Sequence, residues 1–137
     1  MNCTDPARGQ FDFWLGEWDV HRPDGSLAGI NRIEKKHGGC VLHERYETPA
    51  GYSGESLNIY DAARKRWHQT WVDNDGLLLL LEGSLVDGCM VLEGAGHRIA
   101  WTPMPDGSVQ QFWETIDADG AWAVAFDGRY TRRRDQP

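Results

Sequence analysis

Short turn signals recur along the whole chain, and their spacing constrains the fold more than any other feature of the sequence. Dipeptides of the Asp-Gly type support tight hairpins because both central positions of such turns tolerate a positive φ. The signals are Asp24-Gly25, Gly38-Gly39, Asp75-Gly76, Asp87-Gly88, Asp106-Gly107 and Asp119-Gly120. Strand-forming runs lie near 18–22, 27–36, 40–48, 53–60, 67–73, 77–86, 89–94, 98–103, 109–116 and 122–131. The pattern predicts short antiparallel strands joined by hairpins.

About ten such strands predict an all-β protein, built as an antiparallel up-and-down barrel, because closing the sheet removes its exposed edges. The helical candidate is the segment 10–15, a short turn ahead of the first strand, which has the length of a plug or a cap. The 137 residues match the usual size of one domain. We therefore expect a single barrel over residues 1–137, with 1–10 and 132–137 as flexible termini.

The charge balance narrows the choice of partner. The chain carries 14 basic and 21 acidic residues, a formal net charge of -7. This balance argues against nucleic acid or an anionic membrane as the main partner. The basic cluster Arg132-Arg133-Arg134 is expected to be a solvated terminus, since so short a cluster is a weak docking signal. No apolar run has the length of a signal peptide or a membrane helix, so the sequence predicts a cytoplasmic protein.

The cysteines and histidines show no pattern typical of a metal or a cofactor. Cys3, Cys40 and Cys89 are odd in number and without paired spacing, so the sequence implies neither a disulfide framework nor a zinc site. Cys40 and Cys89 lie in apolar contexts, which favours buried reduced thiols over catalytic nucleophiles. His43 and His68 lie inside predicted strands, on the face that we expect to point away from the interior, which argues against haem ligation. We expect no cofactor and no metal.

Tryptophan is abundant, with seven residues in the chain. Trp67, Gln69 and Trp71 fall on one face of a predicted strand, and Trp113 shares a face with Gln111. A buried indole needs an acceptor for its N–H. In a β-protein of this size, such residues either plug the core or line a cavity together with a few polar groups.

The segment 11–20 (Phe-Asp-Phe-Trp-Leu-Gly-Glu-Trp-Asp-Val) resembles the opening of calycin barrels, the group that includes lipocalins, fatty-acid-binding proteins and nitrobindins. The segments 56–61, 67–73, 101–103, 106–109, 113–114 and 126–130 are similar to an uncharacterised bacterial family of that superfamily. The Trp-x-Gln-x-Trp-Val-Asp stretch at 67–73 is the most specific part. The resemblance implies a barrel with a candidate pocket and carries no activity with it.

Strand alternation identifies which residues share the interior. The faces of the predicted strands bring aromatic and polar side chains together, and Arg98 is the cation expected to reach them. The predicted ligand-binding set is Glu44, Tyr46, Asn58, Gln69, Trp71, Arg98, Gln111 and Trp113. A carboxylate alone inside a barrel is costly, so Glu44 must be paired, solvated or protonated.

Three roles are open for these polar groups. They form a structural network with a Glu44–Arg98 pair, they orient a ligand, or Glu44 transfers a proton. The corresponding functions are a binding module for a small apolar or aromatic molecule, and a small acid/base enzyme (an isomerase, cyclase or hydrolase) using Glu44. A third is a dimeric interaction protein without a ligand.

Five consecutive leucines occupy positions 77–81. A strand that is apolar on both faces must pack one face inward and cover the other. The cover is either the N-terminal turn or a second subunit, and we expect a homodimer through Leu77–Leu81.

Overall fold

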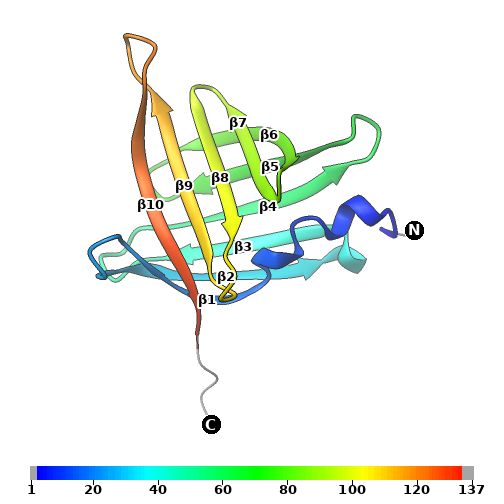
Figure 1. The fold of residues 1–137 in the computed structure, drawn as a ribbon, viewed down its shortest axis with the longest axis horizontal. Coiled ribbons are helices and arrows are strands. Elements are labelled where there is room, and N and C mark those ends of the chain that lie inside the picture. The colour runs from blue at the N-terminus through cyan, green and yellow to red at the C-terminus, as the bar shows by residue number, and fades with distance from the viewer. Residues whose placement is uncertain (1–2, 134–137) are drawn as a thin grey trace.

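The computed structural model describes residues 3–133, and these form a closed antiparallel barrel of ten strands (Figure 1). Each strand pairs with its neighbours in sequence, and β1 closes the ring against β10. The predicted all-β up-and-down barrel is therefore confirmed. The strands are β1 (Gly16–His21), β2 (Leu27–Lys36), β3 (Val41–Glu47), β4 (Ser53–Asp61), β5 (Arg66–Asp73), β6 (Leu78–Val86), β7 (Cys89–Gly94), β8 (His97–Pro103), β9 (Val109–Ile116) and β10 (Trp122–Arg132).

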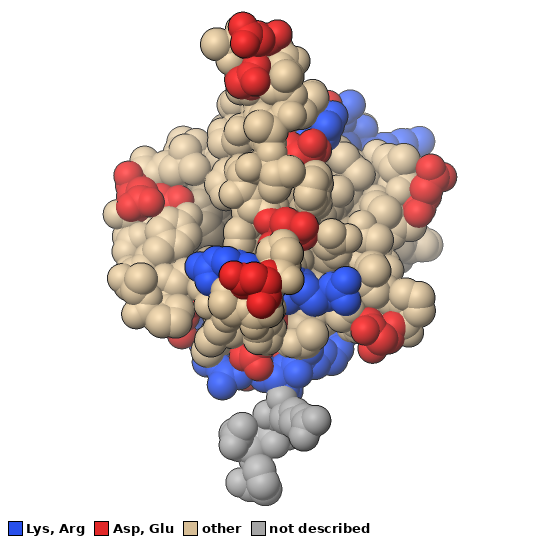
Figure 2. All heavy atoms as spheres, turned by 60° about the vertical axis from the view of Figure 1, so that its left-hand side comes forward, with Lys and Arg blue, Asp and Glu red and all other residues tan. Residues whose placement is uncertain are grey.

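The turn signals fall at the hairpins that they predict. Gly25 between β1 and β2 has a φ of 87°, and Gly120 between β9 and β10 has a φ of 81°. Residues other than glycine rarely adopt a φ in this range, so glycine at these two positions permits the tight reversal of the chain. The β9–β10 hairpin projects furthest from the barrel (Figure 1), and acidic side chains gather at its tip (Figure 2).

An aromatic plug closes one end of the barrel. Two 3₁₀ turns, η1 (Pro6–Gly9) and η2 (Asp12–Trp14), precede β1, and a third, η3 (His37–Gly39), joins β2 to β3. Phe11 and Trp14 are fully buried and stack with 4.7 Å between ring centroids. Trp101 lies 5.1 Å from Phe11 and 5.3 Å from Trp14, and Trp67 lies 5.6 Å from Phe11. The predicted helical turn at 10–15 thus acts as a plug.

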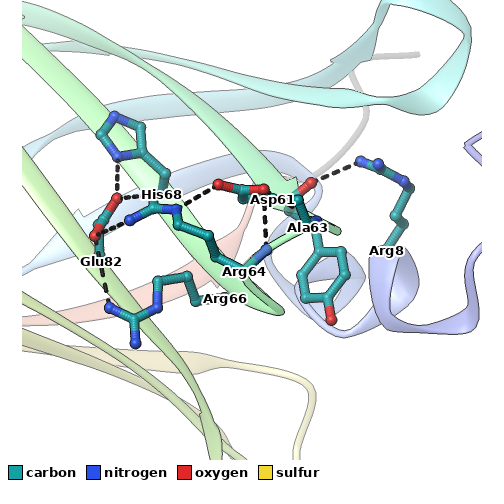
Figure 3. Close-up of polar contacts among 8 residues, drawn as sticks. Arg8, Asp61, Ala63, Arg64, Arg66, His68 and Glu82 are labelled. Carbon is teal, nitrogen blue, oxygen red and sulfur yellow. Dashed lines mark hydrogen bonds and ion pairs between the residues drawn. The ribbon is translucent and has the colours of Figure 1, made fainter.

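Polar contacts hold the plug to the barrel wall. The indole N–H of Trp18 donates to the carbonyl oxygen of Trp14 over 2.8 Å. Arg8 donates to the carbonyl oxygen of Tyr60 over 3.0 Å (Figure 3). Residues 134–137, which include the last arginine of the basic cluster, lie outside the described residues. Arg132 packs over the Trp18 ring at 4.2 Å.

A disulfide links Cys3 to Cys40, with 5.1 Å between the Cα atoms, so the expected absence of a disulfide and the predicted reduced thiol at Cys40 are wrong. The two cysteines lie 37 residues apart in sequence, and only the return of β2 to the plug end brings them together. Cys89 is a free, half-buried thiol that accepts a hydrogen bond from Thr102 over 3.3 Å. A disulfide is more typical of a protein in an oxidising compartment than of a cytoplasmic one. The cytoplasmic location stays a prediction.

A charged cluster on the outer surface fastens the β4–β5 hairpin to β6 (Figure 3). Arg64 donates to Asp61 over 2.6 Å and forms an ion pair with Glu82. The hydrogen bond from Arg64 lowers the pKa of Glu82 to about 2, and His68 contributes a weaker contact at 3.3 Å. His68 thus faces outward as predicted, and so does His43, which contacts Glu55 over 3.0 Å.

The leucine run alternates across β6. Leu79 and Leu81 are buried inside the barrel, whereas Leu78 and Leu80 on the outer face are 62% and 51% exposed. The N-terminal turn therefore does not cover this outer face. The homodimer through Leu77–Leu81 stays a prediction.

The surface in Figure 2 carries basic and acidic side chains interspersed rather than in one basic patch. A field of mixed sign does not favour a polyanion on this face. Among residues 3–133, no helix is both long enough and apolar enough to cross a membrane.

Candidate functional site

A cavity of about 460 Å³ occupies the half of the barrel opposite the plug. It opens where the β1–β2, β3–β4 and β5–β6 connections meet, and Arg22, Thr48 and Asp75 stand at this rim. The cavity is lined by Arg22, Ala28, Glu44, Tyr46, Thr48, Tyr52, Gln69, Trp71, Asp73, Asp75, Leu77, Leu79, Ile99, Gln111, Trp113, Phe126 and Tyr130. Such a mixture of aromatic walls and a few polar groups is typical of small-molecule sites.

The two tryptophans of the cavity wall have partners for their N–H groups. Trp71 donates to Asp73 over 3.0 Å, and Trp113 donates to Nδ1 of His97 over 3.0 Å. Both indoles are half-buried and line the cavity. Their N–H groups are thus satisfied by protein, which leaves the apolar surface of the rings for a ligand.

Asp73 also accepts a hydrogen bond from the Tyr52 hydroxyl over 2.7 Å. Burial raises the pKa of Asp73, but the hydrogen bonds from Tyr52 and Trp71 outweigh it and the net pKa lies below the usual value. Burial and the neighbouring carboxylate raise the pKa of Tyr52. The rim therefore holds a carboxylate that stays ionised and orients two aromatic residues.

Below the cavity, a connected set of polar side chains crosses the barrel, and we call it the polar layer. Its members are Asn31, Glu44, Ser56, Asn58, Gln69, Gln111 and Tyr130. They come from β2, β3, β4, β5, β9 and β10, so only the closed barrel assembles them. Toward the plug, the next inward residues are apolar, such as Leu42 and Trp67.

Glu44 is the centre of the polar layer. Ser56 donates to its Oε1 over 2.6 Å, and the Asn31 amide donates to its Oε2 over 2.7 Å. Asn31 also donates to the Tyr130 hydroxyl over 2.8 Å, and that hydroxyl donates to Gln111 over 2.5 Å. Hydrogen bonds of this kind hold the carboxyl group in place without supplying a counter-charge.

Asn58 links the other half of the layer. Its amide nitrogen donates to Ser56 over 2.8 Å and to the carbonyl oxygen of Leu42 over 3.1 Å. Its amide oxygen accepts a hydrogen bond from Gln69 over 2.8 Å. Asn58 is fully buried behind the cavity wall, so its predicted place in the interior is confirmed, but it supports Gln69 rather than lining the cavity.

Burial raises the pKa of Glu44, while the hydrogen bonds from Ser56 and Asn31 act in the opposite direction by favouring the charged form. Desolvation of the carboxylate is the largest effect because the side chain is almost completely removed from water. Glu44 thus holds its proton more tightly in the folded barrel than in the unfolded chain.

Arg98 lies outside the barrel, so its predicted place in the interior and its pair with Glu44 are wrong. Its guanidinium binds Glu114 over 3.0 Å and stacks on Trp122 at 4.1 Å. Ile99 and Trp101 point inward on β8, and alternation therefore turns Arg98 to the outer surface. Ile99 and Trp101 are the large apolar side chains of this strand, and they were the sequence signal for the observed facing.

The other predicted residues lie inside the barrel. Tyr46, Trp71, Gln111 and Trp113 line the cavity with Glu44 and Gln69, as alternation predicts. Their role in binding stays a prediction. Asn31, Ser56 and Tyr130 also belong to the polar layer, and they are absent from the predicted ligand-binding set.

A β-bulge changes the facing along β10. The register against β9 shifts between Val124 and Phe126, so Phe126 and Tyr130 point inward while Trp122 and Val124 are exposed. Simple alternation places all four on one face. An extra residue in one strand reverses the facing on one side of the bulge.

Two amide groups of the polar layer retain hydrogen-bonding capacity toward the cavity. Gln69 uses its nitrogen on Asn58, and Gln111 uses its oxygen on Tyr130. The Gln69 carbonyl and the Gln111 amino group remain for a ligand. Within residues 3–133, no group of three or more histidine, cysteine, aspartate or glutamate residues is arranged to hold a metal ion.

The stability contribution of Glu44 is expected to depend on pH. Its folded pKa lies above the ordinary value of 4.5, so the free energy of unfolding falls as pH rises from that value through the folded pKa. Replacing Glu44 by glutamine removes this fall, and the difference in stability should shift in favour of the variant as the pH rises above 4.5. Urea unfolding across this range measures the shift. The outer-face variant Glu114→Gln is the control, and parallel profiles for Glu44→Gln and wild type would contradict the expectation.

Neither a protein-family model nor a curated protein sequence matches the chain. The function is therefore inferred from the barrel, the cavity and the polar layer.

Proposed function

We propose that this protein is a binding module that holds a small, mostly apolar or aromatic molecule inside its barrel. The observation that carries the proposal is the cavity itself, in which aromatic walls and free amide groups converge at one end of the barrel. A volume of about 460 Å³ lies within the range of typical ligand pockets. The resemblance to calycin barrels supports the same reading.

The difference in aromatic packing between the two ends of the barrel also supports binding. At the plug end, the side chains of Phe11, Trp14 and Trp101 are fully buried in one apolar cluster. Trp71 and Trp113 at the other end are only half-buried and line open space. Large aromatic side chains that border a cavity leave apolar surface for a ligand to cover, which is the main driving force for binding an apolar molecule.

A cavity-blocking variant tests the proposal. Ala28 is buried and lines the cavity, so Ala28→Phe places a ring in the binding volume. The neutral fluorescent probe N-phenyl-1-naphthylamine is expected to bind the wild type, and Ala28→Phe should weaken its binding at least ~10-fold, or ~1.4 kcal/mol. Fluorescence titration measures the dissociation constants, and circular dichroism checks that the variant keeps its barrel.

The matched control is Leu80→Phe, which adds a ring on the exposed outer face of β6 and should leave probe binding unchanged. The smaller change Ala28→Leu replaces Ala28→Phe if the latter fails to fold. Absence of probe binding to the wild type, or equal binding by wild type and the blocked variant, would contradict the proposal.

A further inference from the structure

We infer that the cavity selects organic cations, that is, molecules that carry an ammonium group on an aromatic or apolar body. The inference rests on the proposed function and names the class of ligand that the site takes. Three features carry it: the charges around the cavity, the unpaired carboxyl of Glu44, and the aromatic walls.

The charged groups that line the cavity are mostly acidic. The lining includes three carboxyl groups and one guanidinium: those of Glu44, Asp73 and Asp75, and that of Arg22. Arg22 is exposed at the rim and donates to the carbonyl oxygen of Leu27 over 3.1 Å, so its own hairpin holds it. No other lysine or arginine lines the cavity in the described part of the chain. The interior potential therefore favours a cation.

Glu44 has hydrogen bonds but no counter-charge. An ionised carboxylate offers about four acceptor positions, and Ser56 and Asn31 occupy two of those on Glu44 with neutral donors. Beside it, the amide oxygen of Asn31 is buried and has no partner among the described residues. Glu44 lines the cavity and is an acceptor when ionised, whereas Asn31 is an acceptor behind the cavity wall. Within the described residues, no lysine or arginine lines the deep end of the cavity beside Glu44, and an ammonium group supplies both the missing positive charge and hydrogen-bond donors.

The walls suit a cation as well as an apolar body. Tyr46, Trp71, Trp113 and Phe126 surround the space above Glu44. Aromatic ring faces attract cations, and the attraction is larger where water is excluded. The same rings cover the apolar part of the molecule.

Carboxylic acids fit this cavity poorly. The carboxylate of a fatty or aromatic acid would meet Glu44 without an intervening cation, because Arg98 binds Glu114 on the outer surface. Two carboxylates in one dry site cannot both remain ionised. An alcohol of the same shape provides a donor but no charge, and is expected to bind between the amine and the acid.

Three ligands with the same indole ring test the inference: tryptamine, tryptophol and indole-3-acetate. In isothermal titration at about pH 8 and low salt, tryptamine is expected to bind the wild type at least ~10-fold more tightly than tryptophol, with indole-3-acetate weakest. Glu44→Gln should weaken tryptamine at least ~10-fold and change tryptophol less than ~3-fold. Asp75→Asn, at the exposed rim, is the control for the charge and should lower tryptamine affinity by less than ~3-fold.

The outcomes separate the inference from the proposed function. Equal affinities, tightest binding of the acid, or an amine preference that survives in Glu44→Gln would overturn the inference. Failure of all three ligands while N-phenyl-1-naphthylamine still binds would overturn the inference and leave the binding function standing. Failure of the probe as well would overturn both. The ligand series on the wild type decides the matter even if Glu44→Gln does not fold.

Discussion

Replacing Trp14 by alanine is expected to lower the free energy of unfolding by about 3–5 kcal/mol. Trp14 is fully buried, stacks on Phe11 at 4.7 Å and packs against Trp101 at 5.3 Å. Its main-chain oxygen also accepts the hydrogen bond from Trp18 that anchors the plug to β1. Loss of the ring would leave a void at the centre of this cluster, which the surrounding strands cannot close.

Urea unfolding followed by circular dichroism measures the loss. Trp14→Phe keeps a ring and removes an indole N–H that has no partner among the described residues, so it is expected to cost less than half as much. Trp122→Ala is the surface control. This side chain stacks on Arg98 outside the barrel and should cost about 1 kcal/mol or less. Equal losses for the Trp14→Ala and Trp122→Ala variants would contradict the assignment of Trp14 to the plug.

Replacing Asn58 by leucine is expected to cost about 3–5 kcal/mol. Leucine has nearly the same size, so packing is largely kept, but three buried partners lose their hydrogen bonds: Gln69, Ser56 and the carbonyl oxygen of Leu42. Each buried polar group left without a partner costs about 1–3 kcal/mol. Ligand binding should weaken as well, because Asn58 positions the Gln69 amide that faces the cavity.

The control for Asn58→Leu is Arg98→Met, which breaks a contact to Glu114 on the outer surface. Surface ion pairs contribute about 0–1 kcal/mol, so this variant should be nearly as stable as the wild type and should bind the fluorescent probe normally. Thermal and urea unfolding of both variants make the comparison. If Arg98→Met lowered the free energy of unfolding as much as Asn58→Leu, the polar layer would contribute no more to stability than a surface ion pair.

The local sequence determined the strands and their hairpins. Asp-Gly turns and period-two runs depend on the φ/ψ preferences of neighbouring residues and on the alternation of side chains, both of which act over a few positions. For the same reason, Trp67, Gln69 and Trp71 could be placed on one interior face before the barrel was known. The short length of the segment 10–15 likewise indicated a plug or a cap.

Only the tertiary structure decided which side chains from different strands come together. The link from Glu44 to Asn31 and Tyr130 joins β3, β2 and β10, and closure of β1 against β10 brings the last of them into reach. The Cys3–Cys40 disulfide depends in the same way on two distant segments meeting at the plug end. No periodicity along the chain encodes such pairings, because they follow from register between strands.

Facing is a property that the sequence indicates on β8 but not on β10. On β8, the large apolar side chains of Ile99 and Trp101 indicate the buried face, and β9 places Trp113 opposite Ile99 and Glu114 opposite Arg98. On β10, the bulge after Val124 reverses the facing that alternation predicts. Alternation divides a strand into two faces and apolar side chains indicate the inner one, but only the register between strands shows where a bulge exchanges the two faces.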